Sequence, residues 1–168
     1  MPFARDVSHG SLIKIPDRAV ALADAGRLRG RQWSLAEICE HLLLAVKSTV
    51  AGASLEGNAW RSEAPWPRRM KRWWLKHGTL RTGFIPFGIE APSIVQPRKG
   101  LELDEAIEQL RVAASDFEDL FQTPGVSWSD HSILGPMSGP MWRRFHHVHA
   151  AHHFNCVETS NVVMASAP

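Results

Sequence analysis

The sequence predicts an all-α protein that folds as a four-helix bundle, with a long irregular crossover between the second and third helices. Apolar residues recur at helical spacing in the segments 35–51, 104–121 and 138–156, and more briefly in 17–28. Five of the eleven prolines fall between residues 52 and 100, where they break any long helical period. Four helices and one long connection pack most simply as a four-helix bundle.

Length and composition indicate one globular domain spanning residues 1–168. Hydrophobic residues make up 44% of the chain and charged residues 21%, and 168 residues can bury a sizeable core. Cys39 and Cys156 do not make a disulfide framework, so a reducing compartment and a cytoplasmic location are expected. No stretch approaches the ~18 apolar residues of a membrane span, so we expect no membrane partner.

The first two helices have recognisable ends. Pro16 fits the first turn of a helix over 17–28, which ends near Gly26 or Gly30. Ser34 and Glu37 form a capping box, in which a hydroxyl and a carboxylate satisfy backbone N–H groups reciprocally. This box predicts a helix over 35–51, with His41 at the edge of its apolar stripe.

Residues 52–100 are predicted to be one connection rather than a second domain. A single short helix is expected over 68–76 (RRMKRWWLK). The segment 84–97 is rich in proline and is predicted to be extended, because proline at this spacing prevents both helix and sheet pairing.

The last two helices complete the fold. Asp104 is a plausible cap for the helix over 104–121. A loop over 122–137 follows, and Ser138 is expected to cap the final helix, with Pro140 in its first turn. The tail after Glu158 shows no strong signal.

The final helix, which contains MWRRFHHVHAAHHFNC over 141–156, indicates a metal site. His149 and His153 are the one histidine pair with i, i+4 spacing, which places Cβ atoms ~5–6 Å apart. They share a helix face with Trp142 and Phe145. Three neutral imidazoles with one open position are typical of a catalytic site for zinc or a similar ion. His41 is the best third ligand, because it lies on the inner half of a well-predicted helix.

Other interpretations of these histidines stay open. His41 can be a satisfied core residue while His149 and His153 are partly solvated. His146 or His152 can pair with His149 at i, i+3 as an alternative ligand set. Otherwise His146, His147 and His152 are expected at the surface or around the ligands.

Three further residues are candidates for catalysis, each with a simpler explanation. Glu37 can orient His41 or act as a general base, but the capping box already accounts for it. Cys156, one turn after His153, can be a fourth ligand or a reactive thiol, or a small buried hydrophobe. His131 can close over the end of the bundle, or be an exposed loop histidine.

A basic run with interleaved tryptophans, over 66–74, suggests nucleic-acid association through phosphate contacts and stacking. The net charge of +2 is small, so a solvated helix face with anchoring tryptophans is favoured and nucleic acid is disfavoured. The chain has no Gly-rich phosphate loop, no GxSxG elbow and no paired CxxC, which argues against nucleotide-binding, serine-hydrolase and zinc-ribbon functions.

Two motifs resemble a known family. The segments SLAEICEHLLLAV and HVHAAHHFNC are similar to the DinB/YfiT-like superfamily of bacterial four-helix bundles, whose members carry one metal-binding histidine on the second helix and an HxxxH pair, often within HxxHH, on the fourth. The segment HSILGPMSGPMW resembles an uncharacterised DinB-like branch, a domain of unknown function. The resemblance covers about 27–156. Ser132 and Cys156 depart from it, where proline and glutamine are common.

The resemblance implies an up-down-down-up bundle, often dimeric, in which His41, His149 and His153 hold zinc or nickel. Some relatives are thiol-dependent transferases. We therefore expect a divalent-metal-dependent hydrolase or thiol-dependent transferase that acts on an unidentified small molecule, with a thiol as one option. The alternative is a non-catalytic bundle that binds a metal or a small molecule. The sequence does not choose between these reactions.

Overall fold

The computed structural model describes residues 10–55, 66–85, 93–98 and 100–165, and side chains within these ranges except those of 66–69 and 158–165. Its elements are five α-helices and a short 3₁₀ helix: α2 (Lys14–Asp24), α3 (Leu35–Ala51), α4 (Trp66–Thr82), η1 (Ser93–Val95), α5 (Leu103–Gln122) and α6 (Gly139–Ala165). Isolated bridges occur, but the described ranges contain no β-strand. The all-α prediction is therefore confirmed.

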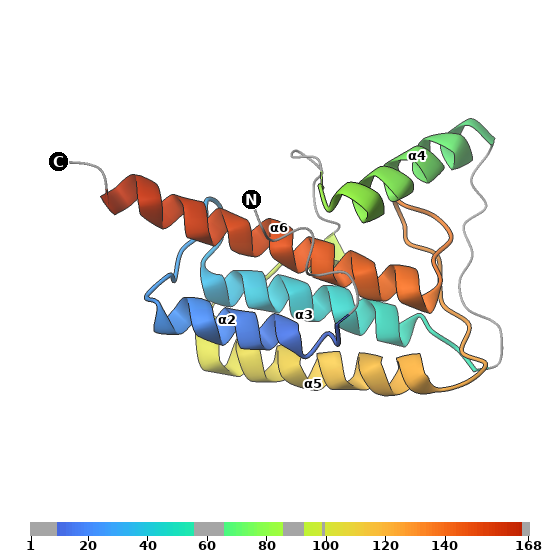
Figure 1. Ribbon diagram of the computed structural model, residues 1–168. Helices are drawn as coiled ribbons and strands as arrows, with labels where there is room; N and C mark the ends of the chain where they lie inside the picture. The colour runs from blue at the N-terminus through green and yellow to red at the C-terminus, as the bar shows by residue number, and fades with distance from the viewer. Residues whose placement is uncertain (1–9, 56–65, 86–92, 99, 166–168) are drawn as a thin grey trace.

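Four of the helices lie lengthwise beside one another, and α4 lies outside them (Figure 1). Helices α2 and α3 run in opposite directions, α5 runs in the same direction as α3, and α6 returns (Figure 1). Helix α3 is central, since it packs against α2, α5, α6 and η1, whereas α4 packs against α6. Among the described helices, none is both long and apolar enough to cross a membrane.

The core is formed by the apolar stripes of these helices, as their sequence periods require. It includes Leu22 from α2, Leu42 from α3, Phe117 from α5 and Phe154 from α6, each at most 4% exposed. The stripe predicted for α3 is buried at Leu35, Ile38, Leu42 and Val46, and Ala45 is half-buried.

Helix α2 begins three residues before the predicted position and ends close to it. Pro16 lies in its first turn, as expected. At the other end Gly26 has φ 68°, a conformation that is cheap for glycine. There the Gly26 N–H donates to the Ala23 carbonyl and the Arg27 N–H to the Leu22 carbonyl, which is a Schellman ending.

The capping box of α3 is present as predicted. Ser34 Oγ accepts from the Glu37 N–H at 3.2 Å, and Glu37 Oε2 accepts from the Ser34 N–H at 2.8 Å. The helix spans Leu35–Ala51, as the sequence indicated. The first turn of α3, and with it the position of His41, is therefore set by local sequence.

The crossover contains more helix than predicted. Instead of nine residues over 68–76, α4 spans seventeen, Trp66–Thr82. Pro67 lies in its first turn, where the missing N–H costs nothing, and no other proline occurs before Pro86. The prediction that the crossover is irregular is thus wrong for α4, and half of the 84–97 segment, residues 86–92, lies outside the described residues.

The remaining boundaries need two corrections. The N-cap of α5 is Glu102, and Asp104 lies in the first turn, where its negative charge suits the helix dipole. Helix α6 continues to Ala165, past the predicted end near residue 156. Its start agrees with expectation, because the Ser138 carbonyl accepts from the Trp142 N–H at 2.9 Å and Pro140 lies in the first turn.

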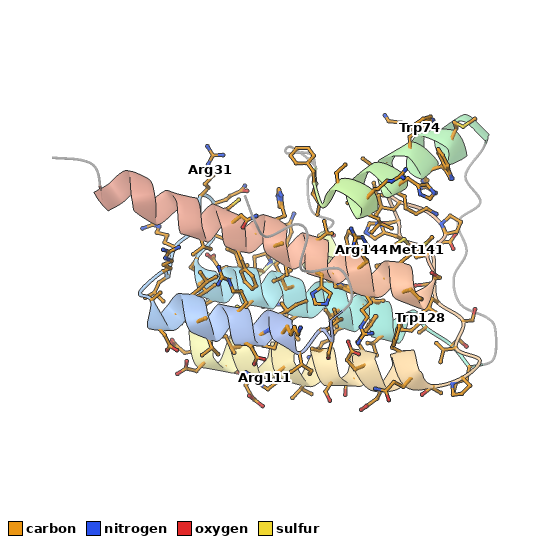
Figure 2. The ribbon with its side chains drawn as sticks, viewed as in Figure 1. Arg31, Trp74, Arg111, Trp128, Met141 and Arg144 are labelled. Atoms are coloured by element: carbon orange, nitrogen blue, oxygen red, sulfur yellow. The ribbon has the colours of Figure 1, made fainter. Side chains whose placement is uncertain are left out.

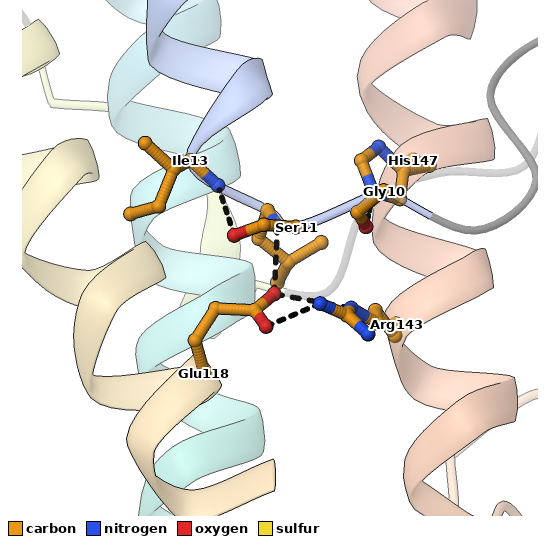
Figure 3. Close-up of polar contacts among 7 residues, drawn as sticks. Gly10, Ser11, Ile13, Glu118, Arg143 and His147 are labelled. Carbon is orange, nitrogen blue, oxygen red and sulfur yellow. Dashed lines mark hydrogen bonds and ion pairs between the residues drawn. The ribbon is translucent and has the colours of Figure 1, made fainter. Parts of the chain in front are cut away.

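An ion pair joins α5 to α6, and its carboxylate also holds the segment just before α2 (Figure 3). Glu118, 7% exposed, accepts from the Arg143 Nε at 3.1 Å and from the Leu12 N–H at 2.7 Å. His147 Nε2 lies 2.7 Å from the Gly10 carbonyl oxygen, to which it donates. These contacts hold the N-terminal segment against the face of α6 opposite the cleft histidines.

Candidate metal centre

Three histidine side chains meet between α3 and α6. His41 comes from the middle of α3, and His149 and His153 come from successive turns of α6. One nitrogen of each ring lies within 4.8 Å of the corresponding nitrogen of the other two. This is the one such group of histidine, cysteine or carboxylate side chains in the described part of the chain, and it can hold a metal ion.

The spacing of the nitrogen atoms fits a single ion. His149 Nε2 lies 3.0 Å from His41 Nε2 and 3.1 Å from His153 Nε2. Two imidazoles that bind one zinc ion at ~2.0–2.1 Å place their nitrogens roughly 2.9–3.4 Å apart, depending on the bond angle. The side chains are therefore already arranged as a set of ligands.

The tautomer of His41 also favours a cation. Its Nδ1 lies 2.6 Å from the Val95 carbonyl oxygen, which can only accept a hydrogen bond, so Nδ1 carries the proton. In the neutral ring the Nε2 lone pair then points at His149 and His153. Metal-binding histidines commonly donate their second N–H to a carbonyl in this way.

Burial keeps all three rings neutral. It lowers the pKa of His41, an effect that the Val95 hydrogen bond partly offsets. Burial, and then the neighbouring His153 and His41, lower the pKa of His149 well below its usual value. Burial lowers the pKa of His153 to about 3. Neutral imidazoles offer lone pairs, so the trio is ready to bind a metal at neutral pH.

Without an ion the arrangement is poorly satisfied. Three nitrogen atoms facing one another cannot all be satisfied by the ring protons, since His41 has none on Nε2. The Nδ1 atom of His149 is also buried without a hydrogen-bond partner among the described residues, but an ion on Nε2 would not change that. A buried unpaired polar group costs roughly 1–3 kcal/mol, and one cation would satisfy the three lone pairs together.

The histidines open into a cleft of about 1240 Å³. Helices α3, α4 and α6, the segment 94–97 and the loop 129–134 form its walls. The lining is mainly apolar, and a small molecule of ordinary size fits a cleft of this volume. The predicted face of α6, from Trp142 through Phe145, His149 and His153 to Cys156, lines this cleft along its length.

Aromatic rings clamp the ligand histidines on both sides. Trp33 stacks on His153, with ring centroids 5.6 Å apart, and its centroid lies 4.9 Å from that of His41. Phe145 stacks on His149 at 5.3 Å. These rings restrict the imidazole rotamers, so the nitrogen atoms stay directed at one point.

Two of the proposed catalytic residues lie away from the three nitrogens. Glu37 is held by the Ser34 backbone and hydroxyl in the capping box and does not line the cleft. Cys156 lines the cleft, but it is outside the histidine group, and its thiol donates to the His152 carbonyl at 3.3 Å. Burial raises the pKa of the Cys156 thiol, with an opposing effect from Arg31.

The third, His131, has a structural task. Its Nδ1 accepts from the backbone N–H groups of Ile133 and Leu134, at 3.0 and 3.2 Å. Its backbone also exchanges two 2.8 Å hydrogen bonds with Gly135, which has φ 76°. The HxxxG element is thus a closed turn. His131 is half-buried against Phe145, so the interpretation as an exposed loop histidine is wrong.

The surface interpretation is also wrong for His146 and His147, which are 1% and 5% exposed. Thr49 donates its hydroxyl to the Ala45 carbonyl and therefore accepts from His146 Nε2 at 3.0 Å. His152 lies on the cleft wall beside His153, with ring centroids 5.2 Å apart. None of the three belongs to the group around His149.

The basic and aromatic run lies on α4, where some side chains face the rest of the protein and others face outward. Lys76 is buried and donates to the Pro136 carbonyl at 2.8 Å, and Arg72 donates to the Ser132 carbonyl at 2.9 Å. Trp74, 67% exposed, lies on the outer side (Figure 2). One of the predicted phosphate-binding cations, Arg72, is thus used to attach α4, and the side chains of Arg68 and Arg69 lie outside the described residues.

Sequence reasoning missed two partners of the site. Trp33 had a usable signal, because an apolar residue directly before an N-cap often packs onto the helix it precedes. The Val95 carbonyl had none. Its contact with His41 joins residues 54 positions apart and uses a backbone atom, which residue type does not reveal.

Comparison with known proteins gives one result. A family model described as "Protein of unknown function (DUF1569)" matches residues 4–160. No curated protein and no solved structure matches the chain.

Proposed function

Because the chain belongs to the DUF1569 family of proteins of unknown function, its activity has to be inferred from its site, and we propose that it is a divalent-metal-dependent enzyme. His41, His149 and His153 would be the protein ligands, and zinc or nickel the ion. The substrate would be a small molecule bound in the adjoining cleft. Hydrolysis and thiol transfer both fit this donor set.

The observation that carries the proposal is the convergence of three Nε2 atoms at separations of 3.0 and 3.1 Å. Imidazole ligands suit zinc and nickel, and a site with three protein ligands leaves a position for water or substrate. When bound, the ion would supply Lewis acidity, which lowers the pKa of a water molecule or thiol to near neutrality.

The residues around the site have separate tasks in this proposal. Val95 and the rings of Trp33 and Phe145 orient the ligands. The apolar walls of the cleft, including Leu75 from α4, exclude water from the bound molecule. Burial keeps the imidazoles unprotonated, so protons do not compete with the ion for them near pH 7.

We further propose that the chain is a single DinB/YfiT-like domain, built as an up-down-down-up four-helix bundle. The directions of α2, α3, α5 and α6 support this arrangement (Figure 1). The origin of the histidines, one from α3 and two from the last helix, also agrees with the resemblance. A homodimer and a cytoplasmic location remain part of the same proposal.

A metal site without catalysis is the competing function. It is favoured by the structural engagement of two of the three predicted catalytic residues, since Glu37 belongs to a capping box and His131 closes a turn. In that case the ion would join α3 to α6 and the cleft would bind a small molecule without converting it.

Metal content decides between a metal site and core histidines. Elemental analysis of untagged protein is expected to give about one equivalent of divalent metal per chain, and His153→Ala is expected to lose it. His77→Ala is the matched control, because His77 is exposed on α4 and lies outside the group. Wild-type protein that takes up neither zinc nor nickel would overturn the proposal.

Cobalt substitution then separates the two functions. In an enzyme with an open position, adding a small thiol should shift the visible spectrum of the cobalt form and add a sulfur-to-metal band. A spectrum unchanged by thiol or azide would indicate a closed, structural site.

A further inference from the structure

We propose that Glu40 is a positioning residue for the metal centre, because it holds the crossover segment whose Val95 carbonyl orients His41. The segment is 93–98, which includes η1. This inference rests on the proposed metal site, and it adds a part of the chain that the ligand motif does not contain. Glu40 itself would touch neither the metal nor the substrate.

The first contact is between His41 and Val95. His41 Nδ1 donates to the Val95 carbonyl oxygen at 2.6 Å, which leaves Nε2 unprotonated and directed at His149. If the carbonyl moved away, the ring could carry its proton on either nitrogen and could also rotate. A part of the His41 population would then present an N–H to the metal position, and affinity would fall in proportion.

The second contact fixes the first. Glu40 Oε2 accepts from the backbone N–H of Arg98 at 2.8 Å, three residues after Val95. Glu40 is 7% exposed, and a hydrogen bond to a carboxylate is among the stronger kinds. Glu40 and His41 are neighbours on α3, and they therefore hold the segment 93–98 at two points. With both contacts present, the segment cannot rotate about either contact.

The segment also forms part of the cleft wall. Val95, Gln96 and Pro97 line the cleft beside the three histidines. The same segment thus sets the tautomer of the metal ligand His41 and forms one side of the space for the substrate. Displacement of the segment is therefore expected both to weaken metal binding and to open the cleft.

The experiment compares Glu40→Ala with Glu40→Gln. The amide oxygen of glutamine can accept from the Arg98 N–H in the same place, whereas alanine removes the acceptor. Zinc affinity, measured by competition with a chromophoric chelator, is expected to fall roughly 10–100-fold in Glu40→Ala, the range seen for partners of metal ligands. In Glu40→Gln it should stay within about threefold of wild type, because one hydrogen bond is retained.

A second readout needs no metal. In the metal-free protein, ¹⁵N shifts of the His41 ring should show a proton on Nδ1 in wild type and Glu40→Gln, and a mixture of tautomers in Glu40→Ala. If wild type binds no metal but the tautomer changes as described, the metal proposal fails and the positioning role stands. Equal tautomers and equal affinities in all three proteins would overturn the positioning role alone.

Loss of fold is controlled with Ile107→Val. Ile107 is buried in α5 and does not line the cleft, so this change lowers stability and leaves the cleft lining unchanged. It should bind zinc like wild type. If Ile107→Val and Glu40→Ala weaken binding equally, or if Glu40→Gln weakens it as much as alanine does, the effect is not positioning and the inference is wrong.

Discussion

At the scale of single residues, the site separates histidines that share one motif. The Nε2 atom of His149 lies between those of His41 and His153, whereas His146 bonds to Thr49 and His147 to the Gly10 carbonyl. Positions that differ by 100° around α6 meet different neighbours. The i, i+4 spacing therefore selected His149 and His153 correctly. The hydrogen bonds of the other three histidines of the motif depend on which residues lie opposite each of them.

Cys156→Ser is expected to leave metal binding intact. The Cys156 thiol donates to the His152 carbonyl and lies outside the histidine group, and burial raises its pKa, so it is a poor source of thiolate. The variant should still hold about one equivalent of metal, with affinity within roughly threefold of wild type. Chelator competition and the cobalt spectrum measure this.

A contrary result would have a clear meaning. Loss of metal in Cys156→Ser, together with loss of a sulfur-to-metal band from the cobalt form, would make the sulfur a fourth ligand. The site would then be closed, and the non-catalytic function would be favoured.

At the scale of elements, α3 is defined by its own sequence and α4 by its surroundings. The capping box starts α3 at the predicted residue, and the apolar stripe continues it. Helix α4 has no such cap signal, and its attachment uses long side chains on distant carbonyls, as with Lys76 on Pro136 and Arg144 on Leu80. Such contacts cannot be recognised before the partner elements are placed.

Ser34→Ala is expected to lower the free energy of unfolding by about 1 kcal/mol, the usual cost of losing an N-cap side chain. The Glu37 N–H would lose its acceptor, and Glu37 would lose one of its two partners in Ser34. Urea denaturation followed by circular dichroism measures the change. Ser34→Thr retains a hydroxyl that can both accept from the Glu37 N–H and donate to the Glu37 carboxylate, so it should stay within a few tenths of a kcal/mol of wild type.

A variant of the other residue of the capping box, Glu37→Gln, tests the catalytic interpretation of Glu37. If Glu37 serves the cap alone, Glu37→Gln keeps both stability and activity. A large loss of activity in Glu37→Gln with unchanged stability would show a proton-transfer role that its place in the structure does not suggest.

At the scale of the whole molecule, burial of histidine is the dominant electrostatic feature. Burial is the largest cause of a lowered pKa at seven histidines in the described chain: His41, His131, His146, His147, His149, His152 and His153. The pKa falls to about 4 at His131 and to about 3 at His146. Each such group stays neutral in the folded protein at pH values where the unfolded chain takes up a proton.

The metal-free protein should therefore lose stability as the pH falls from about 6.5 toward 4, since the unfolded histidines have a pKa near 6.5. Below 6.5 the unfolded state binds more protons than the native state, so the free energy of unfolding rises with pH. Each fully buried histidine contributes at most about 1.4 kcal/mol per pH unit. Urea denaturation at pH 7.5, 5.5 and 4.5, with chelator present, measures the slope.

His131→Asn is the matched variant for this prediction. The asparagine side-chain oxygen can accept from the Ile133 and Leu134 N–H groups in place of Nδ1, and it does not titrate. The slope should decrease by up to about 1 kcal/mol per pH unit. An unchanged slope, or stability independent of pH over this range, would contradict the assignment of these histidines as buried neutral groups.

The sequence alone determined the features that depend on neighbours along the chain. These are the all-α class, the start of α3 at its capping box, the end of α2 near Gly26, one of the two glycines predicted, and the pairing of His149 with His153 on one helix face. Each depends on residues at most five positions apart, where helix geometry dictates the distance.

Only the tertiary structure decided what faces those residues. It brought His41 to the pair, placed the Val95 carbonyl on its Nδ1 and buried the His131 ring against Phe145. These outcomes depend on how α3, α6 and the crossover pack. Packing joins residues more than fifty positions apart, often through backbone atoms that every residue type shares. Residue type and spacing therefore do not predict these contacts.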